Sequence, residues 1–196
     1  MTNKYKNVYI IDTSTVVGPY EHNGPLAKRF DRYYDDFYGN CDSLETFEME
    51  LMTESIKILL EKINKCNNDI DLFIAGDLQN QITSSCYTAR FVGRPFLGIF
   101  SACASNTEGL IIAASMIDSG KCNNSLVSVS SHNMVAEKQF RNPTEYGAPR
   151  PNTATFTATG GASAYLSKEK GMIRIESSTI GKVMDLGQNN PNNSKR

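Results

Sequence analysis

The sequence has few of the residues from which metal sites and redox motifs are built. Its five cysteines include no C-x-x-C pair and it has only two histidines, so no zinc-ligand spacing can be assembled. The first residues, MTNKYKNVYIID, lack the apolar region of a secretory signal, and with an odd number of cysteines this indicates reduced thiols. We therefore expect no metal site and no cofactor.

Long apolar runs and an excess of one charge are also missing. No run approaches the ~18 apolar residues that span a bilayer. The formal net charge is -1, and lysines and arginines are spread along the chain, which argues against a nucleic-acid partner. There is no Gly-x-Gly-x-x-Gly spacing and no phosphate loop. At 196 residues the chain has the length of one globular domain.

The most informative stretch runs from Phe96 to Ser119. An apolar strand leads to Cys103 at a bend, and the helix expected at 105–119 has almost no polar face, so we expect it to be buried on all sides. A cysteine just before a helix meets the positive end of its dipole, which favours the thiolate. The other interpretation of Cys103 is a small packed apolar side chain.

The rest of the chain alternates apolar strands with helices. Strands are expected at 8–11, 71–76, 96–100 and 126–130, and helices from Ser43, which begins a Ser-x-x-Thr cap, to about 63, and at 84–91 and 105–119. This order predicts an α/β fold with a mainly parallel sheet covered on both sides. Then follow a polar loop at 132–151, strands at 153–159 and 162–166 separated by Gly160 and Gly161, and a last strand at 172–180.

A reaction at Cys103 would need a base, and His132 is the candidate because it follows a strand that ends at the same edge of the sheet. The alternative is that His132 orders its loop through hydrogen bonds. Arg141 and Arg150 lie in the next segment. If that segment folds over Cys103, they would form a positively charged lid suited to a carboxylate; otherwise they are solvated surface residues.

Several sequence motifs resemble those of known families. Ala102-Cys103-Ala104, the strand LVSVSS and the run TGGASA at 159–164 resemble the amino-terminal half of the thiolase superfamily, especially ketoacyl synthase III-like enzymes. Longer words resemble the stage V sporulation protein AD family, namely PFLGIFSAC, AEKQFRNPTEYG and TIGKVMDLG. The resemblance implies a thiolase-like βαβαβαββ half at 1–187 with a buried central helix, a disordered tail at 188–196, and an absent second half.

The family resemblance also implies a function. It implies a non-catalytic subunit that binds dipicolinic acid, with calcium accompanying the ligand as its chelate, and that acts in sporulation and germination. Cys103 stands at the nucleophile position but no residue is expected to be catalytic. The residues expected to line the ligand pocket are Cys103, Ala104, Ser105, His132, Asn133, Arg141 and Arg150.

Partners and alternatives complete the expectation. The implied partners are the other stage V sporulation protein A subunits and a second copy of the chain, and the implied location is peripheral, at the inner membrane of the spore or forespore. A cysteine-dependent acyltransferase or ketoacyl synthase is the first alternative. A truncated scaffold that binds no ligand is the second.

Overall fold

The computed structural model describes residues 1–140, 157–171, 173–185 and 187. The strands are β1 (Thr2–Lys4), β2 (Tyr9–Val17), β3 (Arg32–Tyr33), β4 (Phe73–Gly76), β5 (Phe96–Gly98), β6 (Asn124–Ser131), β7 (Gly160–Ser167), β8 (Ile173–Arg174) and β9 (Ser177–Thr179). The α-helices are α1 (Pro19–His22), α2 (Leu44–Lys62), α3 (Thr83–Val92), α4 (Ser105–Asp118) and α5 (Asn133–Phe140). Short 3-10 helices are η1 (Ala27–Arg29), η2 (Asn67–Asp69), η3 (Asn80–Ile82) and η4 (Ala102–Ala104).

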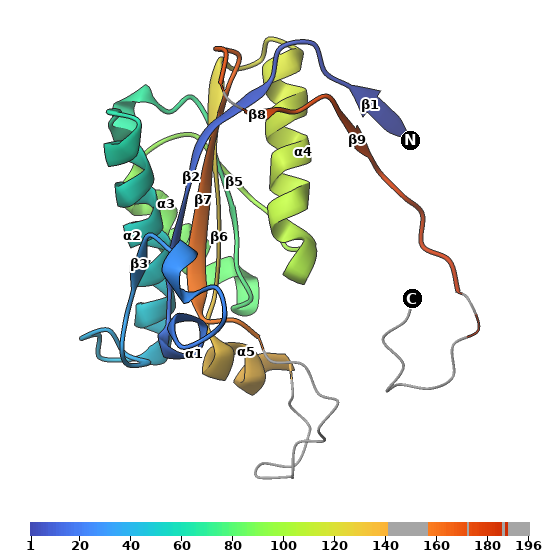
Figure 1. Ribbon diagram of the computed structural model, residues 1–196. Coiled ribbons are helices and arrows are strands. Elements are labelled where there is room, and N and C mark those ends of the chain that lie inside the picture. Colours follow the sequence, from blue (N-terminus) through green and yellow to red (C-terminus); the bar gives the residue numbers. More distant parts are fainter. Residues whose placement is uncertain (141–156, 172, 186, 188–196) are drawn as a thin grey trace.

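The described residues form one large sheet with the strand order β3-β2-β7-β6-β4-β5, and β8 pairs with β2. Strands β5, β4 and β6 are parallel, and β7 lies antiparallel between β6 and β2. Helices α2 and α3 cover one face of this sheet and α4 covers the other (Figure 1). The predicted α/β class, with a mainly parallel sheet between helices, is confirmed, and β7 makes the sheet mixed.

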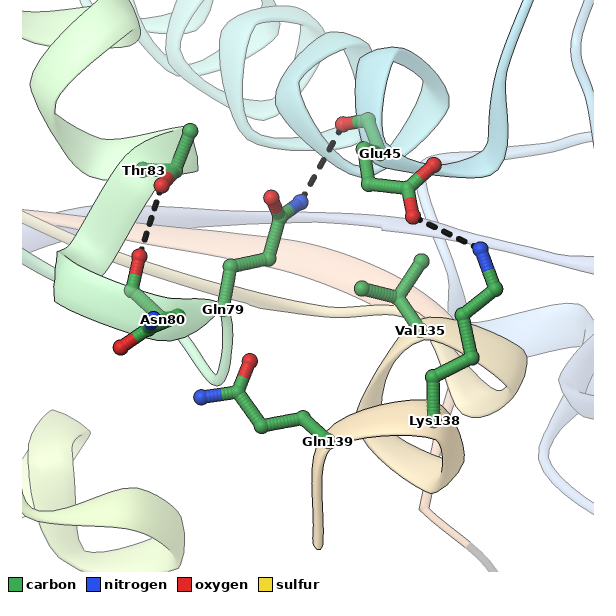
Figure 2. A pocket seen from close by; sticks show the side chains of 7 residues that line it. All are labelled: Glu45, Gln79, Asn80, Thr83, Val135, Lys138 and Gln139. Atoms are coloured by element: carbon green, nitrogen blue, oxygen red, sulfur yellow. Dashed lines mark hydrogen bonds and ion pairs between the residues drawn. The ribbon is translucent and has the colours of Figure 1, made fainter. Parts of the chain in front are cut away.

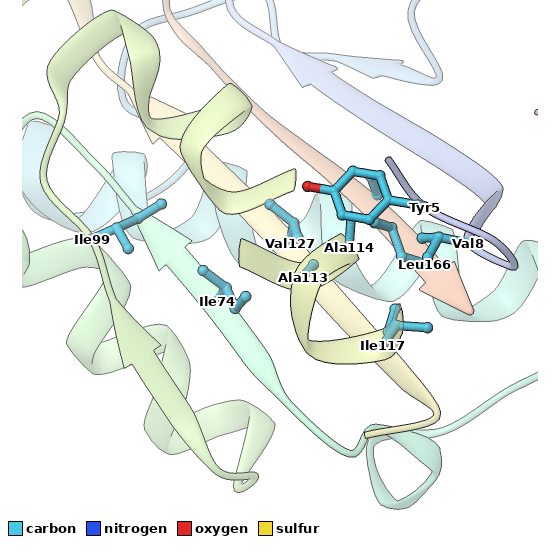
Figure 3. Packing of buried hydrophobic residues seen from close by; sticks show 10 residues of the cluster. Tyr5, Val8, Ile74, Ile99, Ala113, Ala114, Ile117, Val127 and Leu166 are labelled. Atoms are coloured by element: carbon cyan, nitrogen blue, oxygen red, sulfur yellow. The ribbon is translucent and has the colours of Figure 1, made fainter. Parts of the chain in front are cut away.

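Alternation along the central strands divides the core between the two faces. On β4, Phe73 and Ala75 pack with α2 and α3, whereas Ile74 packs with α4. On β7, Tyr165 and Leu166 divide in the same way. Figure 3 shows the cluster on the α4 face. Successive side chains of a strand point to opposite faces, so both apolar layers come from the same strands.

Helix α2 begins where its sequence signal places it. The Thr46 backbone N–H donates to Ser43 Oγ at 3.1 Å, which satisfies one of the first free amides of the helix. The helix then passes very close to β7. A Cβ atom on Gly161 would lie 2.3 Å from the Leu51 carbonyl oxygen, so only glycine fits beneath α2 at this point.

Helix α4 corrects one expectation. Gly109, Ala113 and Ile117 are buried against the sheet, whereas Leu110 and Met116 are only half-buried. The prediction of burial on all sides is therefore wrong for the described residues. The helix has the expected apolar composition, but a single sheet buries only one face of it, and the remaining sides stay partly exposed.

The glycine pair at 160–161 corrects another. We expected a break between two strands, but both glycines lie inside β7, paired with Val17 and Val16 of β2. Glycine is required because α2 passes too close to β7 to leave room for a side chain. The strand itself continues through this position without a break. Of the strand expected at 153–159, residues 153–156 lie outside the described residues and 157–159 are not in a strand.

The segment after β6 also differs. Residues 133–140, expected as part of a polar loop, form α5. One distant and one adjacent residue satisfy its first amides: the Asn133 N–H donates to Thr159 Oγ1 at 3.0 Å and the Met134 N–H to His132 Nδ1 at 3.2 Å. Thr159 lies far along the chain, so its contribution to this start could not be predicted from a local pattern. The expected disordered tail, 188–196, lies outside the described residues.

Strands β1 and β9 pair with each other and not with the large sheet, and they form a ribbon that extends beyond α4 (Figure 1). The Tyr5 hydroxyl holds the base of this ribbon, at 2.6 Å from Ser178 Oγ and 3.3 Å from Ser115 Oγ of α4. Together β8 and β9 replace the single strand expected at 172–180. None of the helices in the described ranges is long and apolar enough to cross a membrane.

Candidate functional site

Cys103 lies at the turn between β5 and α4, as its sequence position predicts. The residue before it, Ala102, has a φ of 47°, a left-handed conformation that costs a non-glycine residue roughly 1–2 kcal/mol. Both Cys103 and Ala104 are exposed. The strained turn therefore presents a thiol and a backbone edge to the outside, directly in front of α4.

Ser105 has a structural place in this turn. Its side chain is buried, and its Oγ accepts the Ser101 N–H at 3.1 Å. The Ser101 hydroxyl donates to the Glu108 carboxylate in the first turn of α4. No side chain caps α4, because Ala104 stands at the cap position. The preceding turn η4 satisfies the first amides instead: the Ala104 N–H donates to the Ser101 carbonyl oxygen at 2.9 Å and the Ser105 N–H to the Ala102 carbonyl oxygen. The positive end of the α4 dipole still favours an anion at this start.

His132 does not meet Cys103. It follows β6, at the same edge of the sheet, but its ring lies against Phe37 and Phe47 on the face that α2 covers, whereas Cys103 precedes α4 on the other face. Its Nε2 donates to the Phe37 carbonyl oxygen at 3.0 Å and its Nδ1 accepts the Met134 N–H. Burial lowers the pKa of His132, so the neutral ring orders two backbone segments.

Asn133 plays a similar part. Its side-chain Nδ2 donates to the Thr157 carbonyl oxygen at 3.2 Å, while its own N–H donates to Thr159. These contacts tie α5 to the chain that enters β7. Arg141 and Arg150, the expected lid residues, lie outside the described residues. The structure thus brings Cys103, Ala104 and Ser105 together and places His132 and Asn133 in a second group.

A hollow of about 550 Å³ lies beside this second group. The first turn of α2, the turn between β4 and α3, and α5 enclose it (Figure 2). Its lining is mostly polar, comprising Glu45, Gln79, Asn80, Thr83, Val135, Lys138 and Gln139. At its edge Lys138 Nζ lies 2.9 Å from Glu45 Oε1, and this ion pair joins α5 to α2.

Sequence reasoning missed the polar residues beneath this hollow. Glu48, on the side of α2 that faces the sheet, is completely buried, and Asp77 and Gln79 are buried just after β4. A helical projection of α2 contains the signal, because Glu48 lies one turn before Met52 and two turns before Ser55 on the face that packs against the sheet. Acidic side chains are rarely fully buried, so a glutamate on the buried face of a helix indicates a polar site inside the protein.

Comparison with known proteins gives the family. A family model described as Stage V sporulation protein AD (SpoVAD) matches residues 2–195. Stage V sporulation protein AD from Bacillus subtilis (strain 168) is 42% identical over 184 residues, which cover 94% of this chain and 54% of that protein. The chain thus spans about half the length of this relative.

Solved structures share the fold at low identity. The 3-oxoacyl-[acyl-carrier-protein] synthase III from Aquifex aeolicus VF5 superposes with a TM-score of 0.55 at 18% identity, over 82% of this chain and 53% of that one. Cerulenin-bound OleA from Xanthomonas gives a TM-score of 0.57 at 18% identity, over 84% of this chain and 56% of that one. These likenesses show a thiolase-like fold.

Proposed function

The chain belongs to the stage V sporulation protein AD family, and from this membership we propose that it is a non-catalytic subunit that binds dipicolinic acid during sporulation and germination. Calcium accompanies the ligand in this proposal. The family match carries the proposal, and the start of α4 supplies a physical place for the ligand.

The exposed turn at Cys103 supports binding of a dicarboxylate. A flat dianion is stabilised by backbone donors and by the positive end of a helix dipole. The α4 start offers the positive end of the dipole, and the exposed Cys103 and Ala104 leave it open to solvent. Ser105 holds the turn, and Arg141 and Arg150 are proposed as the cationic lid.

The placement of His132 supports the absence of catalysis. Nε2 carries the ring proton and donates it to Phe37, while Nδ1, the nitrogen that could take a proton, already accepts the Met134 N–H. The pKa of the ring is lowered as well, so His132 is poorly suited to take a proton from Cys103. In this proposal His132 and Asn133 do not contact the Cys103 thiol; they hold α5 and the chain before β7 in place through their hydrogen bonds.

Variants at exposed cysteines test where the ligand binds. Calorimetric titration with dipicolinate should show weaker binding for Cys103→Ser, because the thiol lines the pocket. Cys86→Ser is the matched control, since Cys86 is also exposed but lies on α3, over the opposite face of the sheet. Equal affinities for the two variants would contradict the proposed location.

An acyl-transfer reaction is the second candidate, and the left-handed turn before Cys103 is the observation that favours it. A strained turn that exposes a cysteine at a helix start is suited to a thiolate nucleophile. Iodoacetamide alkylation near neutral pH distinguishes the two. Reaction of Cys103 many times faster than that of exposed Cys66 and Cys86 would favour the enzyme; similar rates would favour the binding subunit.

We also propose a homodimer through the edge of the sheet. Within the described residues β5 pairs with β4 on one side and with no strand on the other. Leu97 and Phe100 beside this edge are 41% and 56% exposed. An open, apolar edge strand is a template for pairing. Sedimentation should show a dimer that Leu97→Lys converts to a monomer, and a wild-type monomer at high concentration would contradict the proposal.

The proposed location is peripheral, at the inner membrane of the spore, through the other stage V sporulation protein A subunits. The support for this location is family membership. The test is sedimentation of the chain with vesicles that contain those subunits. Equal recovery with empty vesicles would contradict a protein-mediated attachment.

A further inference from the structure

Glu48 is a buried carboxyl group that the proposed function does not use. None of its side chain is exposed, and within the described ranges no lysine or arginine forms an ion pair with it. Gln79 Nε2 donates to its Oε2 at 3.3 Å, Ser130 Oγ donates to its Oε1 at 3.2 Å, and the His132 backbone N–H also donates to it. These neutral donors do not balance a full negative charge.

A second carboxyl group lies close by and is better solvated by the protein. Asp77 accepts hydrogen bonds from the Ser85 N–H at 2.7 Å, the Ser85 hydroxyl at 2.5 Å and the Gln79 N–H at 2.8 Å. Three short hydrogen bonds favour the ionised form of Asp77, but burial outweighs them and raises its pKa. Burial, followed by repulsion from Asp77, raises the pKa of Glu48 to about 7. With a pKa near neutrality, Glu48 passes between its protonated and ionised forms around pH 7.

Gln79 joins this buried pair to the hollow. Its Nε2 lies within hydrogen-bond distance of three acceptors, at 3.3 Å from Glu48 Oε2, 3.2 Å from the Glu45 carbonyl oxygen and 2.8 Å from Ser84 Oγ. A primary amide has two N–H groups, so it cannot satisfy all three at once. The same side chain lines the hollow, where Figure 2 shows it between the α2 end and α5.

The two forms of Glu48 need opposite partners. An ionised carboxylate only accepts hydrogen bonds and keeps the Gln79 N–H, whereas a protonated carboxyl group also donates and pairs well with an amide oxygen. We propose that Glu48 and Gln79 form a proton-operated switch, in which the protonation of Glu48 sets the orientation of the Gln79 amide and so the hydrogen-bond pattern of the hollow.

The other charged groups near Glu48 do not account for a step near neutral pH. Glu45, on the same helix, pairs with Lys138 of α5, and this pair lowers the pKa of Glu45. His132, at the start of α5, is buried and has its pKa lowered. Asp77, after β4, accepts three hydrogen bonds, which partly offset the rise in its pKa caused by burial. Glu48, with a pKa raised to about 7, is the group among these that we expect to change charge around neutral pH.

The turn that carries Gln79 is suited to rearrangement. Gln81 and Ile82, which follow Gln79 in this turn, have φ values of 57° and 50°. Two consecutive left-handed residues that are not glycine, one of them β-branched, adopt an unfavourable backbone conformation. Gln79 and Asn80 of this turn both line the hollow, so a change in the hydrogen bond between Gln79 and Glu48 alters the lining directly.

NMR titration of the full chain tests the switch. The Glu48 side-chain carboxyl carbon should titrate with a midpoint near pH 7, and the Gln79 side-chain NH₂ signals should shift with the same midpoint. In Glu48→Gln this shift of the Gln79 signals should disappear. Glu54→Gln is the matched control: Glu54 lies on the same helix but pairs with Arg32 and Lys57, so its loss should leave the shift in place.

Either of two results would overturn the proposal. One is a Glu48 midpoint near the ordinary 4.5 of glutamate. The other is a Gln79 side chain whose signals stay constant between pH 5.5 and 8.5 while Glu48 titrates. Both are read from the wild-type chain, so the test holds even if Glu48→Gln fails to fold.

Discussion

Gly161→Ala tests how closely α2 and β7 are packed. An alanine Cβ at this position would lie 2.3 Å from the Leu51 carbonyl oxygen and 2.8 Å from the Met52 backbone nitrogen. These are backbone atoms inside α2 and cannot rotate away. The methyl group must therefore push apart a helix and a strand that together carry much of the core.

The size of the effect follows from this contact. Extra methylene groups in a tightly packed core cost typically about 1–3 kcal/mol when side chains can adjust. Here the backbone must move, so we expect about 3 kcal/mol or more, which for a chain of this length lowers the Tm by roughly 6–12 °C. Thermal unfolding followed by circular dichroism measures the shift.

Gly181→Ala is the matched control. A Cβ there has no heavy atom within 4 Å, and Gly181 does not have a positive φ. We expect its Tm to stay close to that of the wild type, with a change in stability within about 0.5 kcal/mol. If Gly161→Ala were as stable as Gly181→Ala, the helix and strand would not be in the contact described, and the account of the uninterrupted β7 would be wrong.

Three further changes have defined outcomes. The pKa of Glu48 is about 7 in the folded state against an ordinary value of 4.5, so the folded state binds the proton more tightly and the free energy of unfolding falls as pH rises from 4.5 through 7. Between pH 5.5 and 8 we expect urea unfolding to show a loss of about 2 kcal/mol. In Glu48→Gln this loss should be absent. His132→Leu should cost about 1–3 kcal/mol, because it leaves the Phe37 carbonyl and the Met134 N–H without partners, and an unchanged urea midpoint would contradict this. Tyr5→Phe should cost about 1 kcal/mol and speed amide exchange in the β1–β9 ribbon, and exchange as slow as in the wild type would exclude the proposed anchoring.

The local parts of the fold could be predicted from the sequence. The Ser43 cap places the start of α2, because the donor and acceptor are three residues apart. The apolar run at 71–76 places β4, and Gly93 ends α3 with a left-handed φ of 66°. Each of these features depends on neighbours along the chain, so a pattern of residue types is enough to find them.

The parts that depend on distant contacts could not be predicted. Helix α5 was missed because its start is satisfied by Thr159. The prediction that Gly160 and Gly161 separate two strands is wrong because the helix that passes over them lies more than a hundred residues earlier in the chain. The half-buried side of α4 was read as buried because composition does not say how many faces of a helix have a neighbour.

The candidate site follows the same rule. The position of Cys103 before α4 could be predicted, since strand, bend and helix are consecutive. The carboxyl edge shared with His132 could also be predicted, but the side of the sheet on which its ring lies could not. The helical spacing of α2 indicates that Glu48 is buried, but its proximity to Asp77 could not be predicted because the two residues come from separate elements that meet only in the folded chain.

Titration calorimetry of the wild-type chain with dipicolinate, with and without calcium, tests the central proposal most directly. The sample is first shown to be folded by circular dichroism. We expect saturable binding at one site per chain. A folded sample that shows no saturable binding under either condition would contradict the proposal that this chain binds dipicolinic acid at the start of α4.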